Sequence, residues 1–182
     1  MRKLRIFESI SIDGYFTDSR GDMSFAHSVS PDPKFAAWVA ANASSDAALL
    51  FGRKTYEMMW PFWTSPAALE QMPEVAKGMN LAKKYLVSKT VEPKWNNTER
   101  LEGELAASVR AIKASDGPPI VVLGSGSVAA ALGEAGLVDE YQFVIVPVAL
   151  GSGRTVFSEG RKLRLASQLA FENGNVVVTY AT

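Results

Sequence analysis

Residues 119–136, PIVVLGSGSVAAALGEAG, decide the class of fold that this sequence specifies. Residues 119–123 form a continuous apolar run, which is typical of a strand buried on both faces of a parallel sheet. Residues 124–127 predict a tight turn, and the alanine-rich segment up to Ala135 predicts a helix that Gly136 ends. A buried strand, a glycine-rich turn and a helix together form the repeating unit of an α/β sheet.

The same alternation of strand and helix patterns continues on both sides of this unit. Strands are predicted at residues 4–12, 47–51, 84–88, 97–101 and 141–148, and helices at residues 33–43, 55–60, 66–82 and 102–114. Pro61 is expected to stop the second of these helices. An Asn-Gly pair at 173–174 predicts a C-terminal β-hairpin of residues 163–171 and 175–180. We therefore predict one α/β domain over residues 1–182, with a mixed but mostly parallel central sheet.

The composition is that of an ordinary globular domain. Hydrophobic residues make up 47% and charged residues 21% of the 182-residue chain, and 19 basic residues balance 19 acidic ones. Because the net charge is zero, no overall field attracts a nucleic acid, and we predict no such partner. No apolar run approaches the roughly 20 residues of a membrane span, and the N-terminus lacks the apolar core of a signal peptide. We therefore expect a cytoplasmic protein without a membrane partner.

Several classes of active site lack the residues that they need. Cysteine is absent and histidine occurs once, as His27. Disulfides and thiolate sites are therefore excluded, no ligand set for zinc remains, and we predict no metal site. Neither Ser125 nor Ser127 lies in a G-x-S-x-G motif, so a serine hydrolase of that kind is not expected.

One candidate phosphate-binding turn consists of Gly124, Ser125, Gly126 and Ser127. It begins a helix directly after a strand, where free backbone N–H groups and the helix dipole favour an anion. The turn comes late in the chain, and the next strand ends near Pro147 instead of at an acid, so an ordinary Rossmann domain is not expected. The alternative is that the glycines only permit a tight connection between strand and helix.

A second candidate turn consists of Gly52, Arg53, Lys54 and Thr55, again at the start of a helix after a buried strand. Two cations at a helix start oppose the helix dipole, and an anionic ligand would relieve that conflict. The glycine spacing does not match that of a P-loop, so NTPase chemistry is not indicated. A solvated basic turn is the alternative.

Asp13, Gly14 and Tyr15 follow the first strand, at the end where α/β sheets bind ligands. Asp13 is the one carboxylate that we can place beside such a site, although an Asp-Gly turn that bonds its own backbone explains it equally well. The loop of residues 17–33 has a length that is usually functional. An aromatic cluster either stacks on a planar ring or belongs to the core; its members are Trp60, Phe62 and Trp63.

Four segments together resemble the dihydrofolate reductase-like superfamily, and in particular its branch with the reductase domain of the bifunctional riboflavin-biosynthesis deaminase-reductase. They are residues 11–15 (SIDGY), 51–57 (FGRKTYE), 84–90 (KYLVSKT), and 124–127 (GSGS) followed by 136–141 (GLVDEY). The resemblance spans nearly the whole chain. It implies a three-layer sandwich in which helices flank a central mixed sheet that includes the C-terminal β-hairpin.

The resemblance also implies that NADPH binds along the strand ends. The residues that would hold its phosphates and its adenosine side are Gly52, Arg53, Lys54, Thr55, Ser88, Lys89, Gly124, Ser125, Gly126 and Ser127. A substrate would lie against Asp13, Gly14, Tyr15, Phe51, Tyr56 and Trp60, with Asp13 as the catalytic candidate for substrate hydrogen bonding or proton relay. Phe35 stands where dihydrofolate reductases carry an acid, and Leu123 where riboflavin-pathway reductases carry Glu.

We therefore expect an NADPH-dependent reductase of a small planar heterocycle, pterin- or aminopyrimidine-like, as in riboflavin or folate metabolism. The riboflavin-pathway activity that the resemblance implies is 5-amino-6-(5-phosphoribosylamino)uracil reductase. The alternative, which the missing helix acid favours, is a non-catalytic nucleotide-binding module of the same fold. The riboflavin-type relatives also suggest a homodimer.

Overall fold

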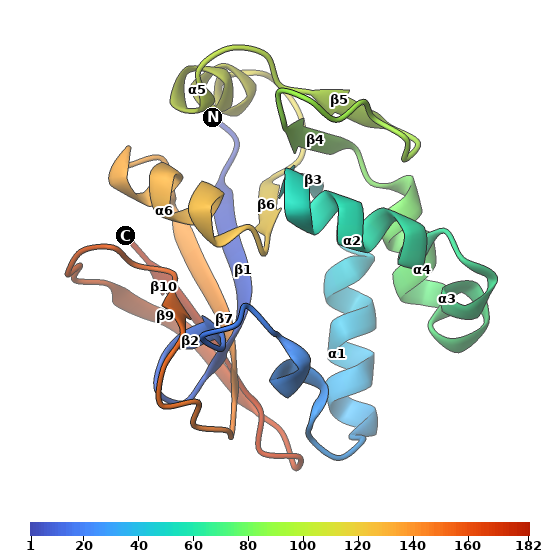
Figure 1. Ribbon diagram of the computed structural model, residues 1–182, viewed down its shortest axis with the longest axis vertical. Helices are drawn as coiled ribbons and strands as arrows, with labels where there is room; N and C mark the ends of the chain where they lie inside the picture. The colour runs from blue at the N-terminus through green and yellow to red at the C-terminus, as the bar shows by residue number, and fades with distance from the viewer.

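The computed structural model describes residues 1–182 and is built around an eight-stranded sheet (Figure 1). The strand order is β5-β4-β3-β6-β1-β7-β10-β9. The strands are β1 (Leu4–Ser11), β3 (Ala48–Gly52), β4 (Lys84–Val87), β5 (Thr98–Arg100), β6 (Ile120–Leu123), β7 (Glu140–Val146), β9 (Arg164–Ala170) and β10 (Val176–Ala181). The strands from β5 to β7 are parallel, whereas β10 and β9 add in antiparallel fashion. The mixed, mostly parallel sheet and the C-terminal hairpin are thus confirmed.

Helices cover both faces of the sheet, which gives the predicted three layers. Their bounds are α1 (Pro33–Ala43), α2 (Arg53–Trp63), α3 (Pro66–Gln71), α4 (Pro73–Leu81), α5 (Leu105–Ala114) and α6 (Gly126–Glu134), and one 3-10 turn, η1 (Ser24–His27), precedes α1. On one face Leu50 packs with Val109 of α5 and Leu132 of α6. On the other, Phe51 packs with helices α2 and α4. Because β3 is buried on both faces, its sequence is the continuous apolar run ALLFG.

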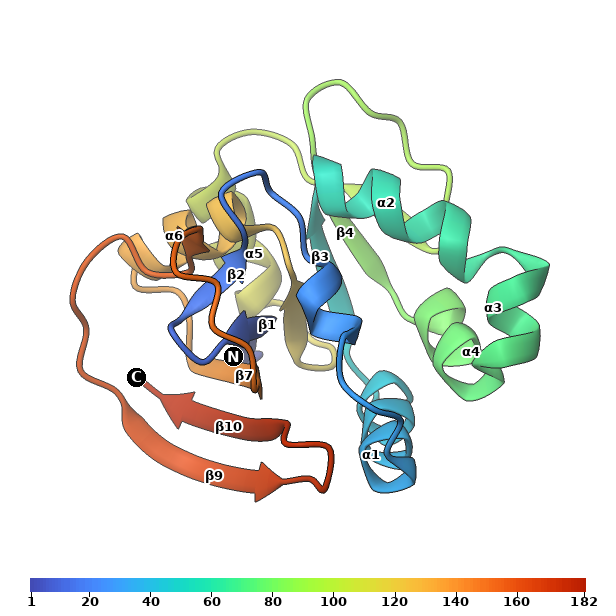
Figure 2. The ribbon, with the colours of Figure 1, turned by 60° about the horizontal axis from the view of Figure 1, so that its bottom comes forward.

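The C-terminal hairpin forms one border of the sheet. Figure 2 shows β9 and β10 on the side of the molecule opposite to α3. All seven residues of β9 are exposed, and no strand pairs with its outer side. No helix of the chain is both long and apolar enough to cross a lipid bilayer.

Two helix boundaries differ from the sequence prediction. Helix α2 does not stop at Pro61 but continues to Trp63. Pro61 and Glu57, whose carbonyl lacks the usual N–H partner, are both exposed, so water can hydrate that carbonyl. The predicted helical stretch 66–82 divides at Met72 into α3 and α4, because Pro73 disfavours a helical conformation in the residue before it.

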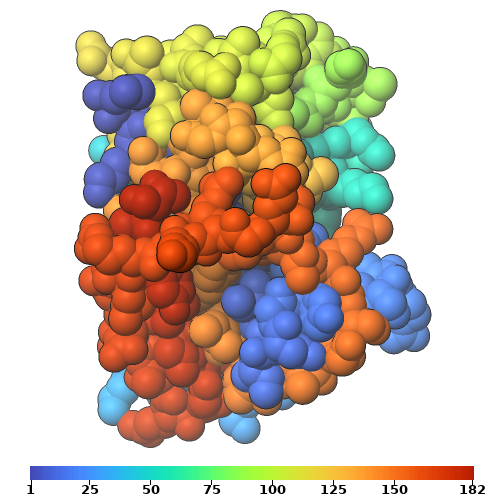
Figure 3. All heavy atoms as spheres, turned by 90° about the vertical axis from the view of Figure 1, so that its left-hand side faces the viewer, coloured from blue at the N-terminus to red at the C-terminus, as the bar shows by residue number.

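A second, small sheet was not predicted. It pairs β2 (Tyr15–Thr17) with β8 (Arg154–Thr155) in antiparallel fashion. In Figure 3 the segment near residue 20 and the segment near residue 150 accordingly lie side by side on one surface. Phe16 of β2 is buried, and its ring packs so closely on Gly126 that a Cβ there would overlap it. The small sheet therefore covers the start of α6.

Candidate functional site

The predicted ligand-binding segments meet at one edge of the sheet. Because β1, β3, β4 and β6 are parallel, their carboxyl ends all lie at that edge. The segments that follow these ends are residues 12–15, 52–55, 88–89 and 124–127. Helices α2 and α6 both begin at this edge, directly after β3 and β6. The fold therefore places the two candidate phosphate turns beside each other.

Ser125 joins the two turns directly. Its Oγ accepts a hydrogen bond from the Gly52 N–H (2.8 Å) and donates one to Thr55 Oγ1 (2.8 Å). Ser125 has a positive φ of 63°, an uncommon conformation that brings its side chain across to α2. A Cβ at Gly52 would lie only 3.0 Å from Ser125 Oγ, which explains why glycine stands there.

The first turns of α2 and α6 carry no acidic cap of their own. Side chains cap three of the other helices: Asp32 caps α1, Ser65 caps α3 and Glu104 caps α5. Neither α2 nor α6 has a side-chain cap or an acidic residue in its first turn. Their first N–H groups and the positive ends of their dipoles thus remain without a negative partner. Two such helix starts, joined by one serine, favour an anionic ligand such as a phosphate group.

The side chains around these turns also fit a phosphate ligand. Arg53 is half-exposed and pairs with Glu57 on its own helix (2.9 Å), and exposed pairs of this kind are weak enough to open for an anion. Ser88 Oγ accepts from the N–H groups of Thr90 (3.2 Å) and Val91 (3.0 Å), which leaves its own proton available. Lys89 beside it is exposed.

Contrary to the prediction, Phe51 and Tyr56 do not line a substrate pocket. Both side chains are 0% exposed and pack between the sheet and helices α2 and α4. The Tyr56 hydroxyl accepts hydrogen bonds from the N–H groups of Lys94 (2.8 Å) and Trp95 (2.7 Å). These two predicted substrate contacts are therefore core residues. Trp60 is half-buried, with Lys94 Nζ 5.7 Å from the centre of its ring.

Asp13 holds the loop that follows β7. Its carboxylate accepts hydrogen bonds from Ser11 Oγ (2.5 Å) and from the N–H groups of Leu150 (3.1 Å) and Gly151 (2.7 Å). These hydrogen bonds lower the pKa of the Asp13 carboxyl below its usual value; the bond from Ser11 has the largest effect and that from Gly151 the second largest. An ionised Asp13 can accept a hydrogen bond from a substrate but is a poor proton donor. Gly14, with a φ of 89°, and Tyr15 follow it at the same edge, and the catalytic role of Asp13 stays a prediction.

Sequence reasoning missed Glu8, which belongs to the same neighbourhood. It lies on β1, is 4% exposed, and its Oε2 has no hydrogen-bond partner. A Cβ at Gly124 would lie 3.7 Å from this Oε2. Burial raises the pKa of the Glu8 carboxyl from 4.5 to about 8. The hydrogen bond from the Ser9 N–H lowers this pKa, but by less than burial raises it. The signal in the sequence is the inward-facing series Leu4, Ile6, Glu8, in which an acid stands at a core position.

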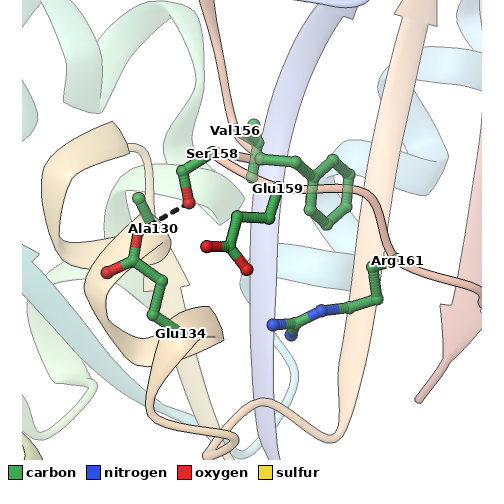
Figure 4. A pocket seen from close by; sticks show the side chains of 7 residues that line it. Ala130, Glu134, Val156, Ser158, Glu159 and Arg161 are labelled. Carbon is green, nitrogen blue, oxygen red and sulfur yellow. Dashed lines mark hydrogen bonds between the residues drawn. The ribbon is translucent and has the colours of Figure 1, made fainter.

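Two hollows in the surface lie away from this edge. The one in Figure 4 has a volume of about 20 Å³ beside α6, where Ser158 Oγ donates to Glu134 (2.6 Å). The other, of about 430 Å³, lies between the end of α1 and α4, near the amino ends of the parallel strands. Ligands of α/β sheets bind at the carboxyl ends, so the joined turns are the better candidate site.

Comparison with known proteins identifies the family of this chain. Residues 2–177 match the model of the RibD C-terminal domain family. The uncharacterized protein YyaP of Bacillus subtilis (strain 168) is 23% identical over 98% of this chain and 94% of its own.

Solved structures share the fold. A protein from Shewanella sp. PV-4, described as a riboflavin biosynthesis protein, has a TM-score of 0.71 at 20% identity, over 98% of both chains. A pyrimidine reductase-like protein from Corynebacterium diphtheriae has a TM-score of 0.65 at 18% identity, over 99% of this chain and 91% of that one. The diaminohydroxyphosphoribosylaminopyrimidine deaminase/5-amino-6-(5-phosphoribosylamino)uracil reductase of Thermotoga maritima has a TM-score of 0.68 at 16% identity, over 99% of this chain but 56% of its own. From the family match over nearly its whole length, we conclude that this chain belongs to the RibD C-terminal domain family.

Proposed function

We propose that the protein is an NADPH-dependent reductase of a small planar heterocycle, pterin- or aminopyrimidine-like. The observation that carries the proposal is the pair of uncapped helix starts, α2 and α6, which Ser125 joins at the carboxyl edge of the sheet. The family is one of NAD(P)H-using reductases. The Thermotoga relative, whose name includes a uracil reductase, supports a pyrimidine-like substrate class.

The chain's own residues would bind, orient and exclude water, whereas NADPH supplies the hydride. The N–H groups that begin α2 and α6 bind phosphate oxygens, and Arg53 adds a charge-assisted contact. Ser125 fixes the distance between the two turns through its bonds to Gly52 and Thr55. On the substrate side Asp13 accepts a hydrogen bond from the heterocycle, and the half-buried Trp60 offers a planar surface.

Arg53→Ala tests the cofactor assignment. Loss of one charge-assisted phosphate contact is expected to weaken NADPH binding by about 1.5–3 kcal/mol, or roughly 10- to 150-fold. The affinity for NADH is expected to change little if Arg53 binds the additional phosphate of NADPH. Calorimetric titration of the wild type and the variant with both nucleotides measures the difference.

A matched control for this experiment is Arg20→Ala. Arg20 is exposed and pairs with Asp18 at 3.1 Å in the loop before η1, so its loss is expected to leave both affinities unchanged. Equal losses for NADPH and NADH in Arg53→Ala would move Arg53 to the pyrophosphate. No binding of either nucleotide to the wild type would refute the proposed function.

A non-catalytic nucleotide-binding module is the second candidate, and one observation favours it. Phe35 of α1 stands where the resemblance to dihydrofolate reductases places an acid. Its ring packs on Trp38 (5.9 Å between ring centres) and edge-on against Phe171 (5.1 Å). Helix α1 thus presents an aromatic cluster where an acid would serve substrate protonation. NADPH binding without NADPH oxidation across a panel of pterins and aminopyrimidines would favour this candidate.

We also propose that the protein forms a homodimer through the edge of β9. The outer side of this strand is unpaired, and Leu165 and Leu169 are each nearly half exposed. Open edges of this kind pair readily with another strand. Sedimentation velocity is expected to give twice the 19.7 kDa chain mass, and the double variant Leu165→Lys, Leu169→Lys is expected to give the chain mass itself. A monomeric wild type at micromolar concentration would exclude the dimer.

A further inference from the structure

Glu8 lies at the core-facing side of β1, directly beneath the turn that begins α6. Leu4 and Ile6 precede it on the same face and belong to the main hydrophobic cluster. In the register of the sheet it is opposite Phe143 of β7, which belongs to the same cluster. On the other side Phe7 pairs with Leu123, so the position next to Glu8 is Gly124. An acid therefore occupies a place that the surrounding residues make apolar.

The two oxygens of Glu8 differ in their surroundings. Oε1 accepts a hydrogen bond from the Ser9 N–H (3.2 Å), whereas Oε2 is buried without a partner. A Cβ built on Gly124 would lie 3.7 Å from this Oε2 and 3.4 Å from Thr55 Oγ1. Because Gly124 has no side chain, only its backbone separates Oε2 from the joined turns. A buried oxygen without a partner is costly and calls for an explanation.

No basic side chain forms an ion pair with Glu8. The adjacent residues of β6 and β7 and the first two turns of α6 carry no ionisable side chain. The ionisable residues of the other adjacent elements are Tyr15 of β2, Arg5 of β1, which pairs with Glu140, and Arg53, Lys54, Tyr56 and Glu57 of α2. The Tyr56 hydroxyl is engaged by the N–H groups of residues 94–95. Burial without a counter-ion raises the pKa of Glu8 to about 8, so the carboxyl is neutral at pH 7.

We propose that Glu8 keeps a proton beneath the phosphate turns, so that the protein binds a nucleotide more tightly when the Glu8 carboxyl is protonated. The inference rests on the proposed function, because it takes the turns to hold a nucleotide. A carboxylate at this position would repel the pyrophosphate, whereas a neutral carboxyl does not. By linkage, the bound anion then holds the proton more tightly on Glu8.

This coupling has a definite sign. Below about pH 8 Glu8 is already neutral, and the nucleotide affinity does not depend on its titration. Above that pH the free protein loses the proton, so binding has to take one up, and the affinity falls by up to about tenfold per pH unit. NADPH itself titrates lower, since a phosphate monoester loses its second proton near about pH 6.

Calorimetric titration with NADPH at pH 7 and pH 9 tests the proposal. Two buffers of different ionisation heat at each pH report the number of protons taken up. For the wild type we expect about tenfold weaker binding at pH 9 and an uptake of more than about half a proton. For Glu8→Gln, which is neutral at every pH, we expect equal affinities at the two pH values and no such uptake. Glu70→Gln makes the same chemical change at an exposed position of α3 and is expected to keep the wild-type pH dependence.

A second measurement needs no variant. Carbon-13 NMR of the labelled Glu8 carboxyl is expected to show a titration near pH 8 in the free protein, moving to higher pH when NADPH is bound. Binding with the same pH dependence in wild type and Glu8→Gln overturns the coupling and leaves the proposed function intact. Absence of NADPH binding by both proteins at both pH values overturns the cofactor assignment, and the coupling with it.

Discussion

Glu8→Gln is expected to stabilise the folded protein by an amount that grows with pH, to about 3 kcal/mol at pH 7 and about 5 kcal/mol above pH 8. The reason is that burial raises the pKa of the folded-state carboxyl from 4.5 to about 8. While this acid is neutral in both the folded and the unfolded state, it adds no pH-dependent cost. The free energy of unfolding falls at a pH where the unfolded chain ionises this carboxyl and the folded chain does not.

The sign follows from the number of protons that each state binds. Below pH 4.5 Glu8 is protonated in both states and adds no pH dependence. Between pH 4.5 and about 8 the unfolded state loses the proton and the folded state keeps it, so stability falls by about 1.4 kcal/mol per pH unit. Above about pH 8 both states are ionised and the loss is complete. Glutamine has no proton to lose and removes this dependence.

Urea unfolding at pH 5, 7 and 8.5 measures the difference between wild type and Glu8→Gln. Lys84 is also buried, and burial lowers its pKa to about 8, but it titrates in both proteins and cancels from the difference. Glu70→Gln, at an exposed position of α3, is a matched control that is expected to stay within about 0.5 kcal/mol of wild type. A stability difference that is the same at pH 5 and pH 8.5 would mean that Glu8 is already ionised in the folded protein.

The parts of the fold that the sequence predicts are those that local pattern determines. The run at Ala48–Gly52 is apolar at every position because it is buried on both faces, so a central parallel strand could be predicted from it. The Asn-Gly pair at 173–174 likewise predicts the C-terminal hairpin, and in the structure Gly174 supplies the positive φ of 88° that closes its turn. Helix α1 begins at Pro33 after the capping Asp32, as local rules require.

The parts that could not be predicted depend on contacts between distant segments. Strands β2 and β8 have three and two residues, too few for a periodic pattern, and they pair across more than a hundred positions. Ser125 could be predicted as a turn residue, but its bonds to Gly52 and Thr55 depend on where β3 and β6 lie in the sheet. Glu8 broke the apolar pattern of β1, yet only the register shows Gly124 beside it.

The same distinction explains the error at Tyr56. An aromatic residue one position beyond a candidate phosphate turn fits a ligand contact and a core position equally well in sequence. The choice between them depends on residues 94–95, whose N–H groups bond the Tyr56 hydroxyl. That loop comes almost forty positions later, and no local pattern links it to α2. A substitution at Tyr56 can therefore distinguish the two roles in solution.

Tyr56→Phe is expected to destabilise the protein by about 2–4 kcal/mol and to leave NADPH affinity unchanged. The substitution keeps the ring, which packs against Phe51 and Trp95, but removes the acceptor for two backbone N–H groups. A backbone N–H that loses its partner in the core costs about 1–3 kcal/mol. The Lys94 N–H is only partly buried and recovers some hydration, so the two costs do not add in full.

Urea unfolding and NADPH titration of the same preparation measure both quantities. Tyr180→Phe is the matched control: its hydroxyl, at a half-buried position of β10, makes no hydrogen bond within the protein, so its loss is expected to cost less than about 0.5 kcal/mol. If Tyr56→Phe kept wild-type stability but lost nucleotide or substrate affinity, the hydroxyl would face the ligand, and the core placement of Tyr56 would be wrong. Loss of stability with intact affinity instead makes Tyr56 a core residue that fastens loop 94–95 to α2 and takes no part in phosphate binding.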